Sequence, residues 1–190
     1  MSSTTAFAPD STLASSSTWN IDPAHSVAEF KVRHMMISYV RGEFAGLSGT
    51  LTLDESDYSH STIEASIPAA SVKTVDETLN AHLKAADFFD VERFPTLTFK
   101  STKIRPEVGR DYAVTGDLTI RGITKSVTLN VKDVSGPSTD PWGNQRIGLS
   151  ASAKFNRKDF GIIWNTALDS GGVLVGDEVA ITLDVQFIRG

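Results

Sequence analysis

The sequence AHLKAADFFDVERFP, residues 81–95, decides how the rest of the chain is interpreted, because only this region has a helical pattern. Leu79, Leu83 and Ala86 recur at i, i+4 and i+7, which is the spacing of one face of an α-helix. The preceding TVDE, residues 74–77, matches a capping box, in which Thr and Glu side chains satisfy the first free amides. The pattern therefore predicts a helix that covers residues 75–86.

Three aromatic residues and a proline follow this helix. Phe88, Phe89 and Phe94 lie between the helix and Pro95, which cannot continue a helix and favours extended backbone at the residue before it. Three rings at one junction require an apolar hollow or core to fill. We predict that residues 75–95 form a lid over an apolar interior, and this segment is called the lid below.

The rest of the chain alternates apolar and polar residues, as half-buried strands do. In the first such run, Ala28, Phe30 and Val32 alternate with charged residues, and His34 has the same parity. A shorter run spans residues 40–44, and the alternation recurs at 47–53, 63–67, 97–101, 114–120, 127–131, 147–155 and 179–187. The pattern predicts an all-β protein, a single antiparallel barrel of about eight strands with one helical insert.

A sandwich of two sheets would also bury one face of each strand, so periodicity alone does not separate the two architectures. The inward positions, however, mix large side chains with small ones. The small ones are Ala28, Gly49, Ala65, Ser101, Gly116, Ala151 and Ala153. A barrel of about eight strands is either just filled or holds one small ligand, so undersized side chains favour a barrel with a cavity.

Composition bounds the class of protein. The chain has 190 residues and 40% hydrophobic content, which suffices for one domain with a sizeable core. A formal net charge of -5 disfavours nucleic acid and anionic lipid surfaces as partners, unless a local basic patch overrides it. There is no cysteine, which excludes disulfides, thiol nucleophiles and cysteine-ligated metals.

The amino terminus differs from the rest of the chain. Residues 1–18 are rich in Ser and Thr and contain no Lys or Arg, so we predict a disordered polar arm at 1–18 and one folded domain at 19–190. Without a basic start or a long apolar run there is no secretory signal pattern, and we expect a cytoplasmic protein. No segment has the roughly 18 apolar residues that span a membrane, so we expect no stable membrane insertion.

Sequence motifs for common chemistries are missing or incomplete. Neither a GxGxxG nor a GxxxxGK[ST] pattern occurs, and GLSGT at residues 46–50 lacks the last glycine of a hydrolase elbow. His25, His34, His60 and His82 do not have the spacing of metal ligands on a strand or helix, so we predict no metal site.

Two polar features remain as candidates. Asp87 and Asp90 form a carboxylate pair near the helix end, where solvated or capping roles are more common than catalysis. In the segment 155–165, Arg157 has the chemistry to bind a phosphate or carboxylate with two hydrogen bonds. The alternative for Arg157 is an ion pair with Asp159 or another acid at a strand end.

Taken together, these segments resemble the YceI-like family, lipocalin-like binders of polyisoprenoids and related long-chain amphiphiles. The resemblance covers residues 19–187 and rests on specific motifs: WNIDPAHS at 19–26, HLKAADFFD at 82–90, FPTLTF at 94–99, GDLTIRGITK at 116–125 and NRKDFG at 156–161. The family usually has Ser where this chain has Ala85. The resemblance implies an extended lipocalin-like barrel, an isoprenoid tail in its pore, a homodimer in some members and no reaction.

The leading hypothesis is therefore a non-catalytic protein that binds, stores or transports a long-chain amphiphile. We expect a polyisoprenoid, such as a polyprenyl phosphate or quinone-like lipid, or a fatty acid or amide, and no other cofactor. The predicted pore residues are Phe30, Val32, His34, Phe44, Leu51, Ala65, Phe99, Leu118, Leu129, Ala151, Phe155 and Trp164. The predicted head-group residues are Arg157, Asn165 and His82.

Two alternatives remain at this point. The first is an enzyme that acts on such an amphiphile, with His34 or His82 as acid or base and Asp87 orienting the imidazole. The second is a subunit whose pore is filled by side chains and whose function lies in dimer contacts. For each pore residue, an ordinary core role is the alternative to ligand binding.

Overall fold

The computed structural model describes residues 16–169 and 171–190. The strands in these ranges are β1 (Ser16–Ile21), β2 (Val27–His34), β3 (Ser38–Phe44), β4 (Ser48–Asp54), β5 (Thr62–Pro68), β6 (Thr96–Pro106), β7 (Tyr112–Ile120), β8 (Ile123–Lys132), β9 (Ser138–Thr139), β10 (Gln145–Asn156) and β11 (Val175–Arg189). The helical elements are α1 (Glu77–Lys84) and the 3-10 turns η1 (Pro23–His25), η2 (Tyr58–His60), η3 (Ala69–Ser71) and η4 (Arg157–Phe160).

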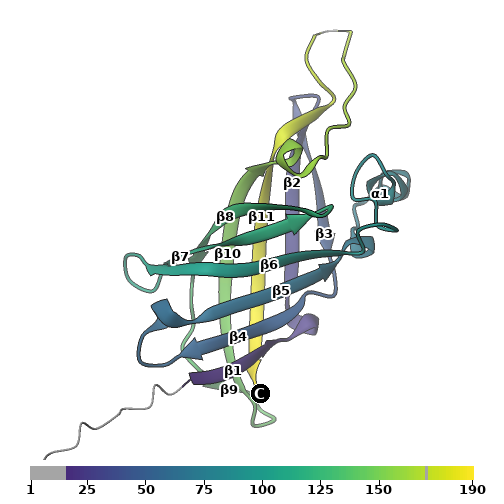
Figure 1. Ribbon diagram of the computed structural model, residues 1–190. Coiled ribbons are helices and arrows are strands. Elements are labelled where there is room, and N and C mark those ends of the chain that lie inside the picture. Colours follow the sequence, from purple (N-terminus) through teal and green to yellow (C-terminus); the bar gives the residue numbers. More distant parts are fainter. Residues whose placement is uncertain (1–15, 170) are drawn as a thin grey trace, which may run out of the picture.

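Eight antiparallel strands close into a barrel (Figure 1). Their order is β11–β1–β4–β5–β6–β7–β8–β10, and pairing between β10 and β11 closes the ring. The remaining strands do not take part in this closure. The β2–β3 hairpin pairs with the upper part of the β11 edge whose lower part pairs with β1, and β9 pairs with the first residues of β10. The predicted barrel of about eight strands with one helical insert is therefore confirmed.

The long strand β11 holds both ends of the barrel together. Its first part pairs with β2, with Ile181 opposite Phe30, and its last part pairs with β1, with Phe187 opposite Ile21. The chain crosses from β1 to β2 at Asp22, whose amide donates to the carbonyl of Gln186 at 2.8 Å. One strand thus carries the hairpin at the upper end, and it pairs with β1 and approaches the C-terminus at the lower end (Figure 1).

The lid differs in detail from its prediction. Asp76, not Thr74, is the N-cap, and its carboxylate accepts hydrogen bonds from the amides of Thr78 (2.8 Å) and Leu79 (3.3 Å). The Thr74 hydroxyl is occupied elsewhere, since it donates to the side chain of Asn80 at 2.9 Å. The predicted helix over residues 75–86 is therefore too long at both ends.

The helix ends at Lys84. The carbonyls of its last residues accept hydrogen bonds from amides further along the chain than those that would continue the helix. Phe89 donates its amide to the carbonyl of Leu83 (3.0 Å), and Val91 donates to Lys84 (3.1 Å). This compact turn swings residues 85–95 back toward the barrel. Just before the lid, Lys73 and Glu43 exchange two backbone hydrogen bonds of 2.9 Å, which attach the lid to the free edge of β3.

The start of the domain also differs from its prediction. Residues 1–15 of the predicted arm lie outside the described residues, whereas residues 16–18 belong to β1. Ser17 is buried, and its hydroxyl accepts a hydrogen bond from the indole of Trp19 at 2.8 Å. The local composition is polar here, but pairing with β4 decides the conformation.

Candidate ligand-binding cavity

The barrel encloses a cavity of about 860 Å³. At its upper end the wall is formed by the β2–β3 hairpin, by α1 and by Trp164, Leu174 and Val175, and at its lower end by Leu47, Val185 and Phe187. Below the cavity a separate apolar cluster is centred on Trp19, which is completely buried. The pore is therefore open in its upper and middle parts and filled by side chains at its lower end, so the alternative of a wholly filled pore does not describe this structure.

Most of the predicted pore residues line this cavity. They are Phe30, Val32, His34, Phe44, Ala65, Phe99, Leu118, Leu129, Ala151, Phe155 and Trp164. Leu51 is the exception, and its predicted pore position needs correction. It lies opposite Trp19 in the β1–β4 register and packs into the lower apolar cluster, because the cavity does not extend down to that level of β4.

Only some of the small inward residues create the cavity. Ala28, Ala65 and Ala151 line it, whereas Gly116 makes room for a neighbour. A Cβ atom on Gly116 would lie 2.4 Å from the ring of Phe99, so this glycine is needed for an aromatic ring to lie flat on the sheet. Gly42 has the same relation to Phe30.

The other small positions are part of the wall. The hydroxyl of Ser101 accepts a hydrogen bond from the amide of Ile63 at 2.8 Å. A Cβ on Gly49 would lie 2.1 Å from the carbonyl oxygen of Glu64, so the close approach of β4 and β5 requires glycine there. Ala153 packs in the core. The small side chains at these positions therefore allow the strands to pack closely. The alternating sequence pattern could not distinguish this role from the lining of an empty cavity.

Aromatic rings hold the lid against the barrel. His82 makes edge-to-face contacts with Phe88 and Trp164, each with ring centroids 4.8 Å apart, and Phe89 meets Phe44 in the same way at 5.4 Å. Phe88 and Phe89 line the cavity, as the lid prediction requires. Phe94 does not, because its ring packs beside Gly122 at the β7–β8 turn.

The pair that the enzyme hypothesis requires is present in part. Nε2 of His82 lies 3.3 Å from a carboxylate oxygen of Asp87, within reach of an orienting contact. His34, the last residue of β2, lies opposite Val175 in the strand register and also lines the cavity. Asp90 is buried beside Arg93, with 3.4 Å between guanidinium and carboxylate, so Asp87 and Asp90 have separate partners.

Arg157 occupies a different environment from the predicted one. Its side chain is only 3% exposed, and its guanidinium donates to the carbonyls of Ile162 (2.7 Å), Trp164 (2.8 Å) and Gly176 (2.9 Å). Burial lowers the pKa of this guanidinium, and the nearby carboxylate of Asp177 opposes that effect. Arg157 lines the cavity, but its donors are directed at the backbone.

Asn165 is not brought to the cavity. Its side-chain amide donates to the carbonyl of Val175 at 2.7 Å, and its oxygen accepts from the amide of the same residue at 3.0 Å. Asn165 thereby pairs with both backbone groups of Val175, the first residue of β11, and is absent from the cavity lining. Of the three predicted head-group residues, Arg157 and His82 line the cavity. Because the Arg157 donors bond backbone carbonyls, only His82 has a side chain that can face a ligand.

Sequence reasoning missed several lining residues. Leu79 and Leu83 were assigned to the buried face of the helix, and that face turns out to be the roof of the cavity. Arg33, Tyr39 and Arg41 also reach its upper end, although Arg33 alternates with the apolar residues of its strand and neither Tyr39 nor Arg41 was predicted to line the pore. No signal in the sequence could have found them, because the free edge of β3 exposes the outward side chains to the cavity mouth.

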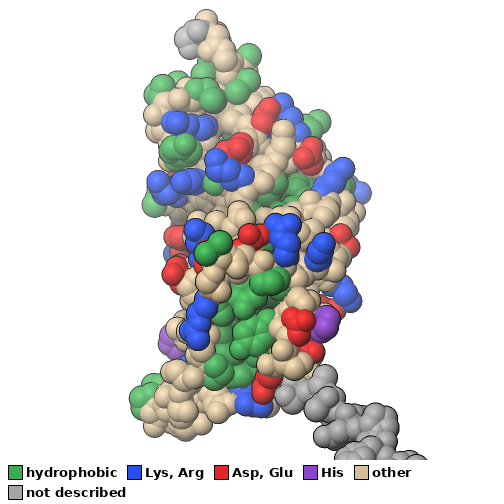
Figure 2. All heavy atoms as spheres, turned by 90° about the vertical axis from the view of Figure 1, so that its left-hand side faces the viewer, with side chains coloured by type: hydrophobic (Ala, Val, Ile, Leu, Met, Phe, Trp, Pro, Cys, Tyr) green, Lys and Arg blue, Asp and Glu red, His purple; other side chains and the backbone are tan. Residues whose placement is uncertain are grey.

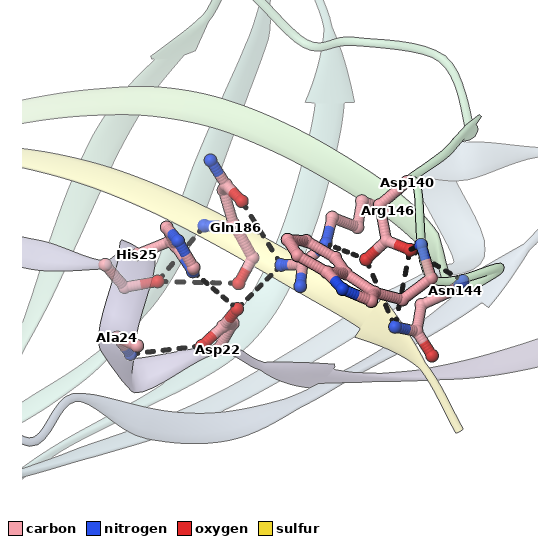
Figure 3. A network of polar contacts seen from close by, with 9 residues as sticks. Asp22, Ala24, His25, Asp140, Asn144, Arg146 and Gln186 are labelled. Carbon is pink, nitrogen blue, oxygen red and sulfur yellow. Dashed lines mark hydrogen bonds and ion pairs between the residues drawn. The ribbon is translucent and has the colours of Figure 1, made fainter.

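At the lower end of the barrel, a polar network links η1 to the loop before β10 (Figure 3). Arg146 lies between two carboxylates, at 2.6 Å from Asp22 and 2.8 Å from Asp140. His25 contacts the same Asp22 carboxylate at 2.8 Å. The Arg146 and His25 hydrogen bonds lower the pKa of Asp22 to about 2, and the Arg146 hydrogen bond holds the pKa of Asp140 well below its usual value.

The remaining histidine lies away from the cavity. His60 faces Asp54 and Asp57 at 3.8 Å on the η2 turn. Across residues 16–169 and 171–190, no three His, Cys, Asp or Glu side chains are grouped closely enough to hold a metal ion. Within the same ranges, no helix is long and apolar enough to cross a membrane.

A closed antiparallel barrel with an apolar interior cavity and one helical lid places this molecule in the class of lipocalin-like barrels. Its family is more specific. The family model described as YceI-like domain matches residues 19–187, and the chain belongs to this family. The resemblance identified in the sequence is therefore confirmed.

Individual relatives agree with this assignment. A UPF0312 protein of Staphylococcus aureus (strain N315) is 35% identical over 170 residues, which cover 89% of this chain and 96% of the relative. The crystal structure of BcnA from Burkholderia cenocepacia matches with a TM-score of 0.76 and 26% identity, covering 87% of this chain and 98% of that one. A polyisoprenoid binding domain from Saccharophagus degradans has the same fold, with a TM-score of 0.64, 16% identity, and coverage of 90% and 98%.

Proposed function

We propose that this protein binds and carries a long-chain amphiphile in its barrel cavity without acting on it chemically. The observation that supports this proposal best is the cavity itself, about 860 Å³ within a closed barrel and lined mainly by apolar side chains. An apolar cavity of this size has no role in stability, because side chains that filled it would gain contacts that the empty space lacks. A ligand with an apolar tail would supply those contacts.

The distribution of polar side chains supports one orientation of the ligand. Charged and polar lining groups, among them Arg33, His34, Arg41, Asp76 and His82, lie at the upper end, whereas Val185 and Phe187 line the lower end. An apolar tail would therefore point down toward the Trp19 cluster and a polar head would lie beneath the lid. We propose His82 as the head-group contact, because its ring both lines the cavity and lies beside a carboxylate.

Tail burial supplies the affinity in this proposal. Each methylene transferred from water contributes about 0.8 kcal/mol, and part of the sum is lost to the ordering of protein and ligand. Affinity should then rise with chain length until the tail reaches the filled lower end of the pore. Selectivity should depend on cavity depth and on the head group.

Isoprenoids are the first ligands to test. The Saccharophagus degradans domain is described as polyisoprenoid binding, and that description supports this choice. Organic extraction of freshly purified protein, followed by mass spectrometry, should yield a long-chain amphiphile in stoichiometric amount. Delipidated protein that rebinds neither prenyl nor acyl chains would refute the carrier function.

A pair of variants separates cavity binding from surface binding. Ala151 lines the cavity, and its neighbour Ser152 is exposed on the outer face of the same strand. Ala151→Phe should weaken binding of a prenyl ligand at least about tenfold because it occupies tail space, with little loss of stability because the space already exists. Ser152→Phe should leave binding unchanged. Equal effects of both variants would place the ligand elsewhere.

The expectations of a homodimer and of a cytoplasmic location belong with this proposal. Size-exclusion chromatography with light scattering, with and without ligand, tests the first. The enzyme alternative is tested by incubating the bound lipid with the protein and with its His82→Ala variant. A product formed by the wild type and not by the variant would show that the protein is an enzyme and would refute the carrier function.

A further inference from the structure

The turn between β2 and β3 lies at the upper end of the barrel (Figure 1). It exposes three apolar side chains, Met35, Met36 and Ile37, which are 39%, 56% and 78% exposed. The turn closes with a hydrogen bond of 3.1 Å from the amide of Ile37 to the carbonyl of His34. Both central residues are left-handed, with φ of 49° at Met35 and 61° at Met36.

This turn is unfavourable for an isolated protein in water. Hairpin turns with two left-handed central residues strongly prefer Asn-Gly, because other side chains are strained there. Two methionines therefore bring both strain and exposed apolar surface to the same site. The turn is also held in place, since the amide of Met35 donates to the carbonyl of Leu174 at 2.8 Å. The backbone hydrogen bond thus fixes the position of the turn that carries the exposed apolar side chains.

Three cations lie next to this tip on the outer face of the hairpin. Arg33, Lys31 and Arg41 surround the ring of Tyr39 at 4.2, 5.5 and 6.0 Å from its centroid. Lys31 and Arg41 lie directly opposite each other in the strand register, an arrangement in which like charges repel. In the described part of the chain, no carboxylate forms a salt bridge with any of the three.

The charge on this face changes sign along the hairpin. Glu29 and Glu43 form the opposed pair farther from the turn, so positive charge gathers only near the apolar tip. Figure 2 shows apolar, basic and acidic side chains interspersed over the upper part of one face of the molecule. The protein as a whole has a net charge of -5, so its overall charge does not account for attraction to an anion. The patch is local.

We propose that this tip, residues 31–41, docks the protein on an anionic phospholipid bilayer. The apolar turn would enter the headgroup boundary while the three cations contact lipid phosphates, which is how interfacial elements combine apolar burial with charge. His34 and Leu174, which flank the turn, line the cavity. Docking would thus place the upper end of the cavity against the membrane, where an amphiphile could enter or leave.

Vesicle binding tests this proposal independently of cavity binding when delipidated wild type is compared with Ala151→Phe, whose tail space is occupied and which should bind vesicles equally. Wild type should sediment with phosphatidylcholine vesicles that contain phosphatidylglycerol, more weakly with phosphatidylcholine alone, and less in high salt. Arg33→Ala/Arg41→Ala should weaken binding to the anionic vesicles about tenfold to thirtyfold, since each cation near such a surface contributes about a factor of five.

A second variant separates docking from stability. Met35→Asn/Met36→Gly/Ile37→Ser replaces the apolar tip with the residues that this turn prefers, so the protein should melt at the same temperature or higher. Its vesicle binding should nevertheless fall about tenfold or more, because the apolar insertion is lost. If the turn has only a structural role, this variant should be more stable and should bind vesicles as strongly as wild type. That result would overturn the proposal.

Matched controls lie away from the tip. Trp142 is 80% exposed on the loop before β10, and Trp142→Ser removes an apolar side chain of larger size. Lys103→Ala/Lys132→Ala removes two exposed cations from other strands. Both controls should bind vesicles like wild type. Equal losses in these controls, or wild type that does not prefer anionic vesicles, would refute the docking surface.

Discussion

At the scale of single residues, Arg157 shows how far a side chain's role can depart from its sequence context. Its position after Phe155 and its charge predict a contact with the ligand head group, yet its guanidinium donates to three backbone carbonyls, those of Ile162, Trp164 and Gly176. A ligand would have to displace one of these acceptors. The head-group role remains untested, and the contacts favour a role in holding the loop before β11.

This arrangement predicts a large effect of Arg157 on stability. Arg157→Leu leaves buried carbonyls without donors, and we expect the free energy of unfolding to fall by about 3–5 kcal/mol, as for a buried charge network that loses one partner. Urea denaturation measures it. Lys158→Leu is the control, because its exposed ammonium pairs with Asp177 and such pairs contribute about 0–1 kcal/mol.

The same variant distinguishes the two roles of Arg157. If Arg157→Leu remains folded, a head-group role predicts weaker binding of a charged-head ligand by roughly 1.5–3 kcal/mol and unchanged binding of a neutral analogue. A structural role predicts equal changes for both. A stability close to that of wild type would contradict the structural role.

At the scale of elements, the lid depends on one capping side chain. Asp76 accepts hydrogen bonds from the amides of Thr78 and Leu79, so Asp76→Ala should destabilise α1 by about 1 kcal/mol. Hydrogen exchange of residues 77–84 should accelerate about fivefold if this helix opens locally. Glu77→Ala removes the residue that the capping-box prediction required, and it should have a smaller effect. A larger effect of Glu77→Ala than of Asp76→Ala would instead support the capping box of Thr74 and Glu77.

The network at the lower end couples two connections, η1 and the loop before β10, to pH (Figure 3). The pKa of Asp22 is about 2 in the folded protein, below the ordinary value of about 3.9 for the unfolded chain. A depressed pKa contributes stability above the unfolded value, and this contribution is lost as the pH falls from about 4 to about 2. Acid should therefore loosen this end of the barrel.

Asp22→Asn tests this coupling. The variant lacks the titrating group, so its unfolding free energy should depend on pH between about 4 and 2 with a slope smaller by up to one bound proton. Urea denaturation at a series of pH values measures the slope. Glu107→Gln alters an exposed carboxylate that pairs with Arg105 and should leave the slope close to that of wild type. Identical slopes for Asp22→Asn and wild type would place the acid sensitivity elsewhere.

At the scale of the whole molecule, cavity filling should stabilise the fold. A ligand that binds only the folded protein contributes about 2.7 kcal/mol when its concentration is 100 times Kd. For a chain of this length that corresponds to a rise in Tm of about 5–10 °C. Differential scanning calorimetry of delipidated protein with a prenyl ligand measures it. Ala151→Phe should show a much smaller rise, and an equal rise would mean that the ligand stabilises from outside the cavity.

Sequence alone determined the type of fold, its apolar interior and the place of the lid. The reason is local: side chains alternate between faces of a strand, so residues such as Phe30, Phe99 and Ala151 must share one side once the chain forms a barrel. The aromatic residues that follow α1 require burial wherever the chain leads them. Specific motifs then pointed to the family before any distance was known.

Only the tertiary structure decided how deep the cavity runs and which polar groups reach it. Leu51 has the correct parity but lies level with Trp19, and this depth depends on the pairing of β1 with β4. Arg157 meets Gly176 because β10 and β11 are neighbours. Parity is a property of one strand, whereas depth and partner depend on the stagger between strands far apart in sequence, which no local pattern specifies.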